Sequence, residues 1–404
     1  MADLLARFGA GDVALLERLM GPAAREGAAV APDRVVLDAP VAAAQPRYVE
    51  LTRHAGVPLL IDPQTHYLQD VQHVGDPWAR LPYASASAHT PADLTSPARQ
   101  DELVAGCLEY QLEHGASALL PPYVHIERDD DGWIEVQTAL WRRTRRYLDR
   151  HHLVLPVVAV TAVGWRLLDR TRWPGGIDRL AAVLDDLGAD EIALAASRVD
   201  QGARPDDRLV GLVATVRRLR GQAPVLAWQQ GLLGEAAVAA GAAGYETGIG
   251  WRERCDLRTA AAAHRRPPVD GARFGARPVY IPALGRSIPK STLQTLLGTR
   301  LSAQLLCMDH RCCPEGPASL LSDARGHALT SRARSLHTLD RISRHAWRWH
   351  HLADTNTEAL QLAERINTLA SRRPDITRVN TNALRAVQVV ADNRRQTLGR
   401  RRAA

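Results

Sequence analysis

The sequence predicts an α/β fold, a closed (β/α)8 barrel of the TIM type, followed by a cysteine-rich segment and a helical C-terminal extension. From about residue 34 onward, short apolar runs that end in polar residues alternate with longer helical patterns, as in βα units around a parallel sheet. The 404 residues accommodate one barrel of about 250 residues and an appendage. After Pro289 the strand pattern gives way to helices and three clustered cysteines.

Eight apolar segments are expected to form the strands. They are 34–40, 57–62, 116–125, 153–163, 191–197, 224–229, 244–249 and 279–283. Between them, segments such as 177–188 and 206–221 repeat apolar residues at i, i+3 and i+4 and end at glycine, which indicates helices. Eight strands close a barrel, although an open doubly wound sheet would give the same periodicity. In either fold the active site is expected at the C-terminal ends of the strands.

Charge and cysteine content narrow the class of protein. No segment approaches the roughly 18 to 20 apolar residues of a membrane span, and the N-terminal segment mixes acidic with apolar residues, unlike a secretory signal. We therefore expect a cytoplasmic protein that does not contact a membrane. The net charge of +7 and the arginine-rich ending NRRQTLGRRRAA favour a polyanionic partner, with a solvated tail as the alternative.

Polar residues end several of the expected strands. Asp62 and Glu246 are carboxylates that interrupt apolar strand ends, and such a pair across a barrel mouth can divide the work of nucleophile and general base. Helix capping or pairing with an arginine is the alternative for each. Four further residues at or just beyond strand ends are candidates for binding a substrate. They are Tyr123, Thr161, Gln229 and Arg252, the last as a phosphate contact or a surface salt bridge.

The cysteines are clustered near residue 310. Three of the five, Cys307, Cys312 and Cys313, lie within seven residues, which suits a metal better than disulfides in a reducing compartment. Asp309 and His310 lie in the same loop, and His337 lies on a later predicted helix. Thiolates from a tight loop with an imidazole from a later helix are a common structural zinc site. Incidental cysteines and a surface histidine are the alternative.

The order of these features resembles the tRNA-guanine transglycosylase superfamily, which includes relatives that insert 7-deazaguanine bases into DNA. The segment LLIDPQTHYLQ resembles that family's LTDSGGFQ element, and PVLAWQQGLLGEAAVAAGAAGYETGIG resembles its RYLMGVGTPEDLLEAVALGVDMFDCV. The resemblance implies that Asp62 is the catalytic acid/base and that Glu246 is the nucleophile of a covalent glycosyl intermediate.

The family's zinc motif, CxCxxC with a later histidine, is also similar to this chain. Its positions match Cys307, Asp309, Cys312 and His337. Asp309 departs from the motif, so the fourth ligand is Asp309, His310 or Cys313, and we favour Cys313 because sulfur is softer. The resemblance thus implies a structural Zn²⁺ site made of Cys307, Cys312, Cys313 and His337.

The activity implied by the resemblance is exchange of a purine base, guanine for a free 7-deazapurine, in DNA or tRNA. The chain departs from the family where it has Glu246 in place of aspartate and Thr161 in place of glutamine, and where the Gly-Gly after Asp62 is missing. Two alternatives stay open: an inactive barrel that binds nucleic acid or a protein partner, and an unrelated barrel enzyme in which Asp62, His66 and Glu246 do acid–base work on a small molecule. The choice between DNA and tRNA, and homodimer formation, also stay open.

These predictions divide the chain into four parts. They are a helical lead-in at residues 1–33, the barrel at 34–300, a zinc-binding subdomain at 301–352 and a helical extension with a basic tail at 353–404.

Overall fold

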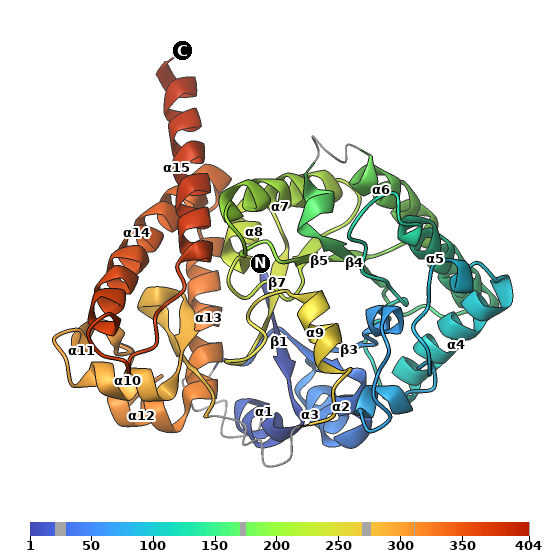
Figure 1. Cartoon of the computed structure of the whole chain (residues 1–404), viewed down its shortest axis with the longest axis horizontal. Coiled ribbons are helices and arrows are strands. Elements are labelled where there is room, and N and C mark those ends of the chain that lie inside the picture. Colours follow the sequence, from blue (N-terminus) through green and yellow to red (C-terminus); the bar gives the residue numbers. More distant parts are fainter. Residues whose placement is uncertain (21–29, 170–174, 269–275, 311, 404) are drawn as a thin grey trace.

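The computed structural model describes residues 1–20, 30–169, 175–268, 276–310 and 312–403, with side chains up to residue 396. A curled parallel sheet lies at its centre and helices surround it (Figure 1). The sheet strands are β1 (Asp3–Phe8), β2 (Arg34–Asp38), β3 (Leu59–Asp62), β4 (Val158–Gly164), β5 (Glu191–Ser197), β6 (Val225–Ala227) and β7 (Gly244–Gly248). Their order in the sheet is β3-β2-β1-β7-β6-β5-β4.

The eighth strand position of the barrel is occupied by an irregular segment, 118–126. It forms parallel bridges to both edge strands, Leu60↔Ala118 on β3 and Leu119↔Val157 and Ile126↔Val163 beside and within β4. These bridges close the sheet into a (β/α)8 barrel of the TIM type, so the fold prediction is confirmed. The predicted strand at 116–125 corresponds to this segment.

The predicted helical lead-in at residues 1–33 is wrong at its start, because residues 3–8 form β1. This strand lies between β2 and β7, with Leu5 opposite both Arg34 and Glu246. Its apolar residues are fully buried on both faces, and only Arg7 breaks the run. The following helix, α1 (Val13–Met20), agrees with the prediction, and residues 21–29 lie outside the described part of the chain.

The last predicted barrel strand, 279–283, belongs elsewhere. Its residues form β8 (Val279–Ile281), which pairs antiparallel with β9 (Arg286–Ile288) in a separate hairpin. The barrel therefore ends with β7. Its eight strand positions are β1 to β7 and the irregular segment 118–126. The residues of β8 are apolar like those of a barrel strand, and periodicity alone does not separate the two cases.

Nine helices of the described chain belong to the barrel half. They are α1, α2 (Ala39–Ala44), α3 (Arg47–Ala55), α4 (Pro97–Glu113), α5 (Trp133–Arg150), α6 (Gly176–Leu187), α7 (Pro205–Leu219), α8 (Gly234–Ala240) and α9 (Leu257–Ala263). The predicted helices at 177–188 and 206–221 match α6 and α7. Each longer helix buries an apolar stripe against the sheet and exposes its charged residues, as an outer-ring helix should.

The C-terminal part is helical apart from the β8–β9 hairpin. Its helices are α10 (Lys290–Leu297), α11 (Ser302–Leu305), α12 (Pro317–Ser322), α13 (Ala324–Asp340), α14 (His345–Ala370) and α15 (Asn382–Ala403). Helices α10 to α14 gather on one side of the barrel, away from α4 and α5 (Figure 1). Helix α14 packs on α8, and α15 packs on α7 and α14. A second apolar core holds this part together.

The predicted basic tail continues α15, but its side chains from residue 397 onward lie outside the described part. Within the described ranges no helix is both long and apolar enough to cross a membrane.

Candidate functional site

Four charged side chains meet at the C-terminal ends of neighbouring strands. Arg7 comes from β1, Asp38 from β2, Asp62 from β3 and Glu246 from β7. Side chains two residues apart on a strand share a face. In β1, β2 and β3 the residue two positions earlier, Leu5, Val36 or Leu60, belongs to the apolar cluster inside the barrel. The charged residues therefore form the next layer of the interior, at the mouth where barrel enzymes place their active sites.

Arg7 is the centre of this layer and its side chain is 2% exposed. Its Nη2 donates to Asp62 Oδ2 at 2.8 Å and its Nε donates to Glu246 Oε1 at 3.0 Å, while Nη1 donates to Asp38. Burial opposes the charge of Arg7, but the three carboxylates outweigh it and hold its pKa well above the usual value. An arginine can be buried here only because these partners replace its hydration.

The carboxylates differ in how strongly they are held ionised. Burial alone would raise the pKa of Asp38, but Arg252 and Arg7 lower it to about 2. For Glu246 burial is the largest effect and raises the pKa, in spite of Arg7 and the backbone N–H of Gln229, which donates to Oε2 at 2.7 Å. The layer thus combines an aspartate whose pKa is lowered with a glutamate whose pKa is raised.

The structure connects three of the predicted substrate-binding residues to this layer. The hydroxyl of Tyr123 donates to Asp62 Oδ1 at 2.8 Å, and Arg252 forms an ion pair with Asp38. Gln229 takes part through its backbone N–H rather than its side chain. Thr161 lies within β4, where its buried hydroxyl has no hydrogen-bond partner in the described structure and no direct contact with Arg7 is found.

Sequence reasoning missed Arg7, which joins the predicted pair Asp62 and Glu246. The available signal was a single arginine inside a short apolar run, two residues after Leu5. On a strand this spacing places both side chains on one face, so an inward Arg7 implies buried carboxylates nearby.

His66 lies beside this layer, on a 3-10 helix (Thr65–Gln69) that follows β3. It is 3% exposed, and neither ring nitrogen has a hydrogen-bond partner among the described residues. Its ring stacks on Tyr123, with centroids 5.4 Å apart and an angle of 22° between the planes. Burial, followed by repulsion from His125 and His264, lowers the pKa of His66 well below its usual value, so the ring is neutral at pH 7.

The turn that carries His66 is tied to the charged layer. Gln64 has a left-handed backbone with φ of 50°, which costs free energy for a residue with a Cβ. Its backbone N–H donates to Asp62 at 3.0 Å and its side-chain amide donates to Asp38 at 3.0 Å. These two bonds hold the turn, and with it the position of His66.

The neutral histidines predict a loss of stability on mild acidification. Burial lowers the pKa of His125 from 6.5 to about 4, so the unfolded chain binds a proton at pH 5 that the folded chain does not. The free energy of unfolding is therefore not reduced by His125 above pH 6.5 and decreases as the pH falls toward 4. The expected decrease between pH 7.5 and 5 is about 2 kcal/mol. Urea unfolding of wild type and His125→Gln at both pH values measures it. Equal pH dependence in the two proteins would refute the assignment.

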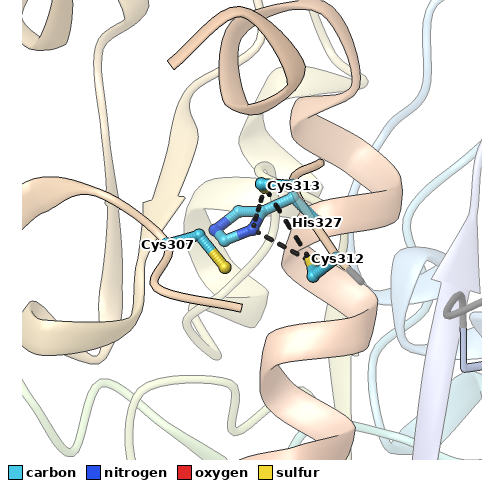
Figure 2. A group of neighbouring side chains, drawn as sticks. All are labelled: Cys307, Cys312, Cys313 and His327. Carbon is cyan, nitrogen blue, oxygen red and sulfur yellow. Dashed lines mark hydrogen bonds between the residues drawn. The ribbon is translucent and has the colours of Figure 1, made fainter. Parts of the chain in front are cut away.

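The second cluster, in the C-terminal part, consists of Cys307, Cys312, Cys313 and His327 (Figure 2). Their ligand atoms all lie within 4.8 Å of one another, and this is the only group of that kind in the described ranges. His327 Nδ1 is 3.4 Å from the sulfurs of both Cys312 and Cys313, which are 4.0 Å apart. The group could therefore hold a metal ion.

The backbone fixes the orientation of His327. Its Nε2 donates to the carbonyl oxygen of Tyr280 in β8 at 2.9 Å, so the proton is on Nε2 and the lone pair of Nδ1 faces the thiols. A hydrogen bond of this kind on the remote ring nitrogen is typical of metal-binding histidines. The hydrogen bond with Cys313 and burial raise the pKa of the Cys312 thiol to about 12, which shows how unfavourable adjacent thiolates are here without a cation.

The histidine predicted for this cluster, His337, is wrong, and His327 takes its place. Both lie on α13, but His327 is in its first turn, beside the cysteine loop. His337 is ten residues later, about 15 Å along the helix axis. The alternatives to Cys313 are also wrong, since Asp309 pairs with Arg334 and neither Asp309 nor His310 belongs to the cluster.

The chain was compared with known proteins. No family model and no curated protein matches it. Among solved structures it is similar to 2,3-dimethylmalate lyase, a PEP mutase/isocitrate lyase superfamily member, at 12% identity over 65% of this chain and 80% of that one, with a TM-score of 0.34. It is also similar to the carboxyl transferase domain of Rhizobium etli pyruvate carboxylase, at 13% identity over 97% of this chain and 62% of that one, with a TM-score of 0.35.

The prediction of a base-exchange transglycosylase is wrong. In the structure, the guanidinium of Arg7 bridges Asp62 and Glu246, the two carboxylates that would have to face the sugar, and both are completely buried. Glu246 is thus engaged as a counter-ion instead of being presented as a nucleophile. The resemblance to the transglycosylase superfamily, and nucleic acid as a partner, stay predictions.

Proposed function

We propose that this chain is a barrel enzyme that transfers a proton to or from a small carbonyl compound at the C-terminal mouth, with His66 as the proton-transferring group. The observation that carries the proposal is the pair of unpartnered ring nitrogens of His66, buried at that mouth. Buried polar atoms without partners are rare and are enriched at functional sites. A neutral imidazole offers one acceptor and one donor, so the ring can take a proton from a substrate and return one.

The surrounding residues support this role by position. The ring of Tyr123 stacks on His66 and is held through its hydroxyl by Asp62. Arg7 fixes Asp62 in turn, so the aspartate keeps its orientation. In this arrangement Asp62 and Tyr123 are positioning residues, and Arg252, whose side chain is 47% exposed beside the mouth, holds Asp38 in an ion pair.

We also propose that the cluster of Cys307, Cys312, Cys313 and His327 holds a structural zinc ion. Zinc–sulfur bonds of about 2.3 Å in a tetrahedron place sulfurs about 3.8 Å apart, close to the 4.0 Å between Cys312 and Cys313. Four protein ligands leave no open position, which is typical of structural zinc sites. The ion would tie the cysteine loop to α13.

Deuterium exchange tests the proposed reaction. Wild type is incubated in D2O with 2-oxo acids, 3-oxo acids and their phosphate monoesters, and NMR follows exchange at the carbon next to the carbonyl group. We expect exchange with at least one compound, and a rate roughly 10² to 10⁴ times lower for His66→Gln. His54→Gln, at an exposed histidine near the end of α3, is the matched control and should keep the wild-type rate.

Two results would contradict the proposal. One is an unchanged rate in His66→Gln, and the other is the absence of exchange by wild type with every compound. In the second case, salt-dependent binding of DNA or RNA would favour the remaining alternative, a barrel that binds nucleic acid without chemistry.

A further inference from the structure

A cavity of about 340 Å³ lies beside the barrel mouth, at the loops that follow the last two strands of the barrel, β6 and β7. Leu232 follows β6, and residues 250–254 follow β7. The other walls are residues 286–289, at β9 and the start of α10, and residues 377–380, between α14 and α15. In TIM barrels the loops after the seventh and eighth strands, with the N-terminus of a short extra helix, frequently form a phosphate site.

Arg286 lines this cavity with a buried side chain. It is 6% exposed, its Nε has no hydrogen-bond partner among the described residues, and one Nη donates to the carbonyl oxygen of Asn380. No carboxylate of the described residues lies within ion-pair distance of it. Burial accordingly lowers its pKa to about 10, although Glu253 and Asp200 act in the opposite direction. A buried arginine without a full counter-charge is costly, and an anion in the cavity would supply that charge.

Three other charged residues that line the cavity, Arg252, Arg254 and Glu253, form ion pairs within the protein. Arg252 pairs with Asp38, and Arg254 pairs with Asp200 at 3.0 Å. The acidic wall residue, Glu253, is engaged as well. Its carboxylate accepts from Arg332 at 2.7 Å and from both the backbone N–H and the hydroxyl of Ser287.

Two arginines of the cavity therefore lack a carboxylate partner in the described structure, the buried Arg286 and the exposed Arg378. Their combined charge of +2 matches a phosphate monoester, which carries about −1.5 to −2 at pH 7. We propose that this cavity binds the phosphate monoester group of a small molecule. The volume suits one small ligand, and a nucleic-acid backbone offers only singly charged diesters.

The cavity is linked to the proton-transfer site. Arg252 lines the cavity, and its guanidinium donates a hydrogen bond to Asp38, which also accepts one from Arg7. A phosphate held against Arg286 would thus lie one arginine away from the charged layer. That this phosphate is part of the substrate rests on the proposed function, whereas the existence of the anion site does not.

Calorimetric titration with inorganic phosphate, at constant ionic strength set with sodium chloride, tests the site. We expect saturable binding to wild type, with affinity at least tenfold lower in Arg286→Met and in Arg378→Gln. The exposed Arg378 provides a variant that does not disturb the core. Arg372→Gln is the matched control, because it removes the same charge from the same α14–α15 connection but does not line the cavity.

Each other outcome overturns the inference. No phosphate binding by wild type, or equal binding by the wild type, Arg286→Met and Arg378→Gln proteins, would exclude an anion site here. Tight, salt-dependent binding of a single-stranded oligonucleotide that displaces phosphate would assign the cavity to nucleic acid. His66→Gln should bind phosphate like wild type, so failure of the proton-transfer proposal would be seen separately from failure of the site.

Discussion

Replacing Arg7 with methionine is expected to lower the free energy of unfolding by about 3 to 5 kcal/mol at pH 7, because it leaves the buried carboxylates of Asp62 and Glu246 without a cation, while Asp38 keeps Arg252. Asp62 and Glu246 are completely buried, so water cannot take over the role of the guanidinium. Methionine fills a similar volume, and the loss therefore reports charge rather than packing. Urea unfolding of both proteins at pH 7 measures the difference.

Arg34→Met is the matched control for this experiment. Arg34 also joins carboxylates from two other elements, Asp3 and Glu191, but its side chain is 19% exposed. Water can therefore hydrate those carboxylates after the substitution, and a loss of about 1 kcal/mol is expected. Equal losses in the two variants would show that the buried layer has no special importance for stability.

Acidification should reduce the difference in the free energy of unfolding between wild type and Arg7→Met. Without Arg7 the buried carboxyl groups have folded-state pKa values above their unfolded values near 4, so the variant's deficit is absent below pH 4 and grows as the pH rises through the folded-state values. In the wild-type protein the lowered pKa of Asp38 acts in the opposite sense, because its stabilisation is full above pH 4 and is lost as the pH falls toward 2, whereas the raised pKa of Glu246 acts as in the variant. A gap between the two proteins that widens at low pH would contradict the assignment.

Replacing His327 with alanine is expected to remove bound metal and to lower the free energy of unfolding by about 4 kcal/mol, since it deletes one ligand of a structural site. The metal content of the purified protein, measured by plasma mass spectrometry, should fall from about one zinc per chain to none. Thermal unfolding should show the same loss in the metal-depleted wild type.

His337→Ala is the control that separates the two candidate histidines. It lies on the same helix, is partly buried like a ligand, and does not belong to the cysteine cluster. The variant should keep its zinc and most of its stability. Retention of metal by His327→Ala, or its loss from His337→Ala alone, would refute the ligand set.

Most of the barrel could be predicted because its strands are apolar runs with polar ends. The strands β2, β3 and β5 coincide with predicted segments to within two residues at either end. The N-terminal strand could not be recognised in this way. Arg7 makes its sequence look amphipathic, and the carboxylates that allow its burial are 31, 55 and 239 residues away. No local pattern contains that information.

The site was predictable to a similar degree. Strand-end reasoning found Asp62, Glu246 and Tyr123, because chemistry in a barrel gathers at one edge of the sheet. It did not identify their roles, which depend on whether a cation fills the space between them. For the metal cluster, the cysteines were found from their clustering, whereas the choice between His327 and His337 depends on which turn of α13 faces the loop.

The placement of β1 has a consequence for how the protein is made. This strand is synthesised before the other barrel strands, yet one of its neighbours is β7, and Leu5 lies opposite Glu246. The barrel therefore cannot close until β7 has been synthesised, and until then β1 can pair only with β2. Contacts of such long sequence separation slow folding. Nascent chains that end before β7 should consequently present an open sheet edge to chaperones.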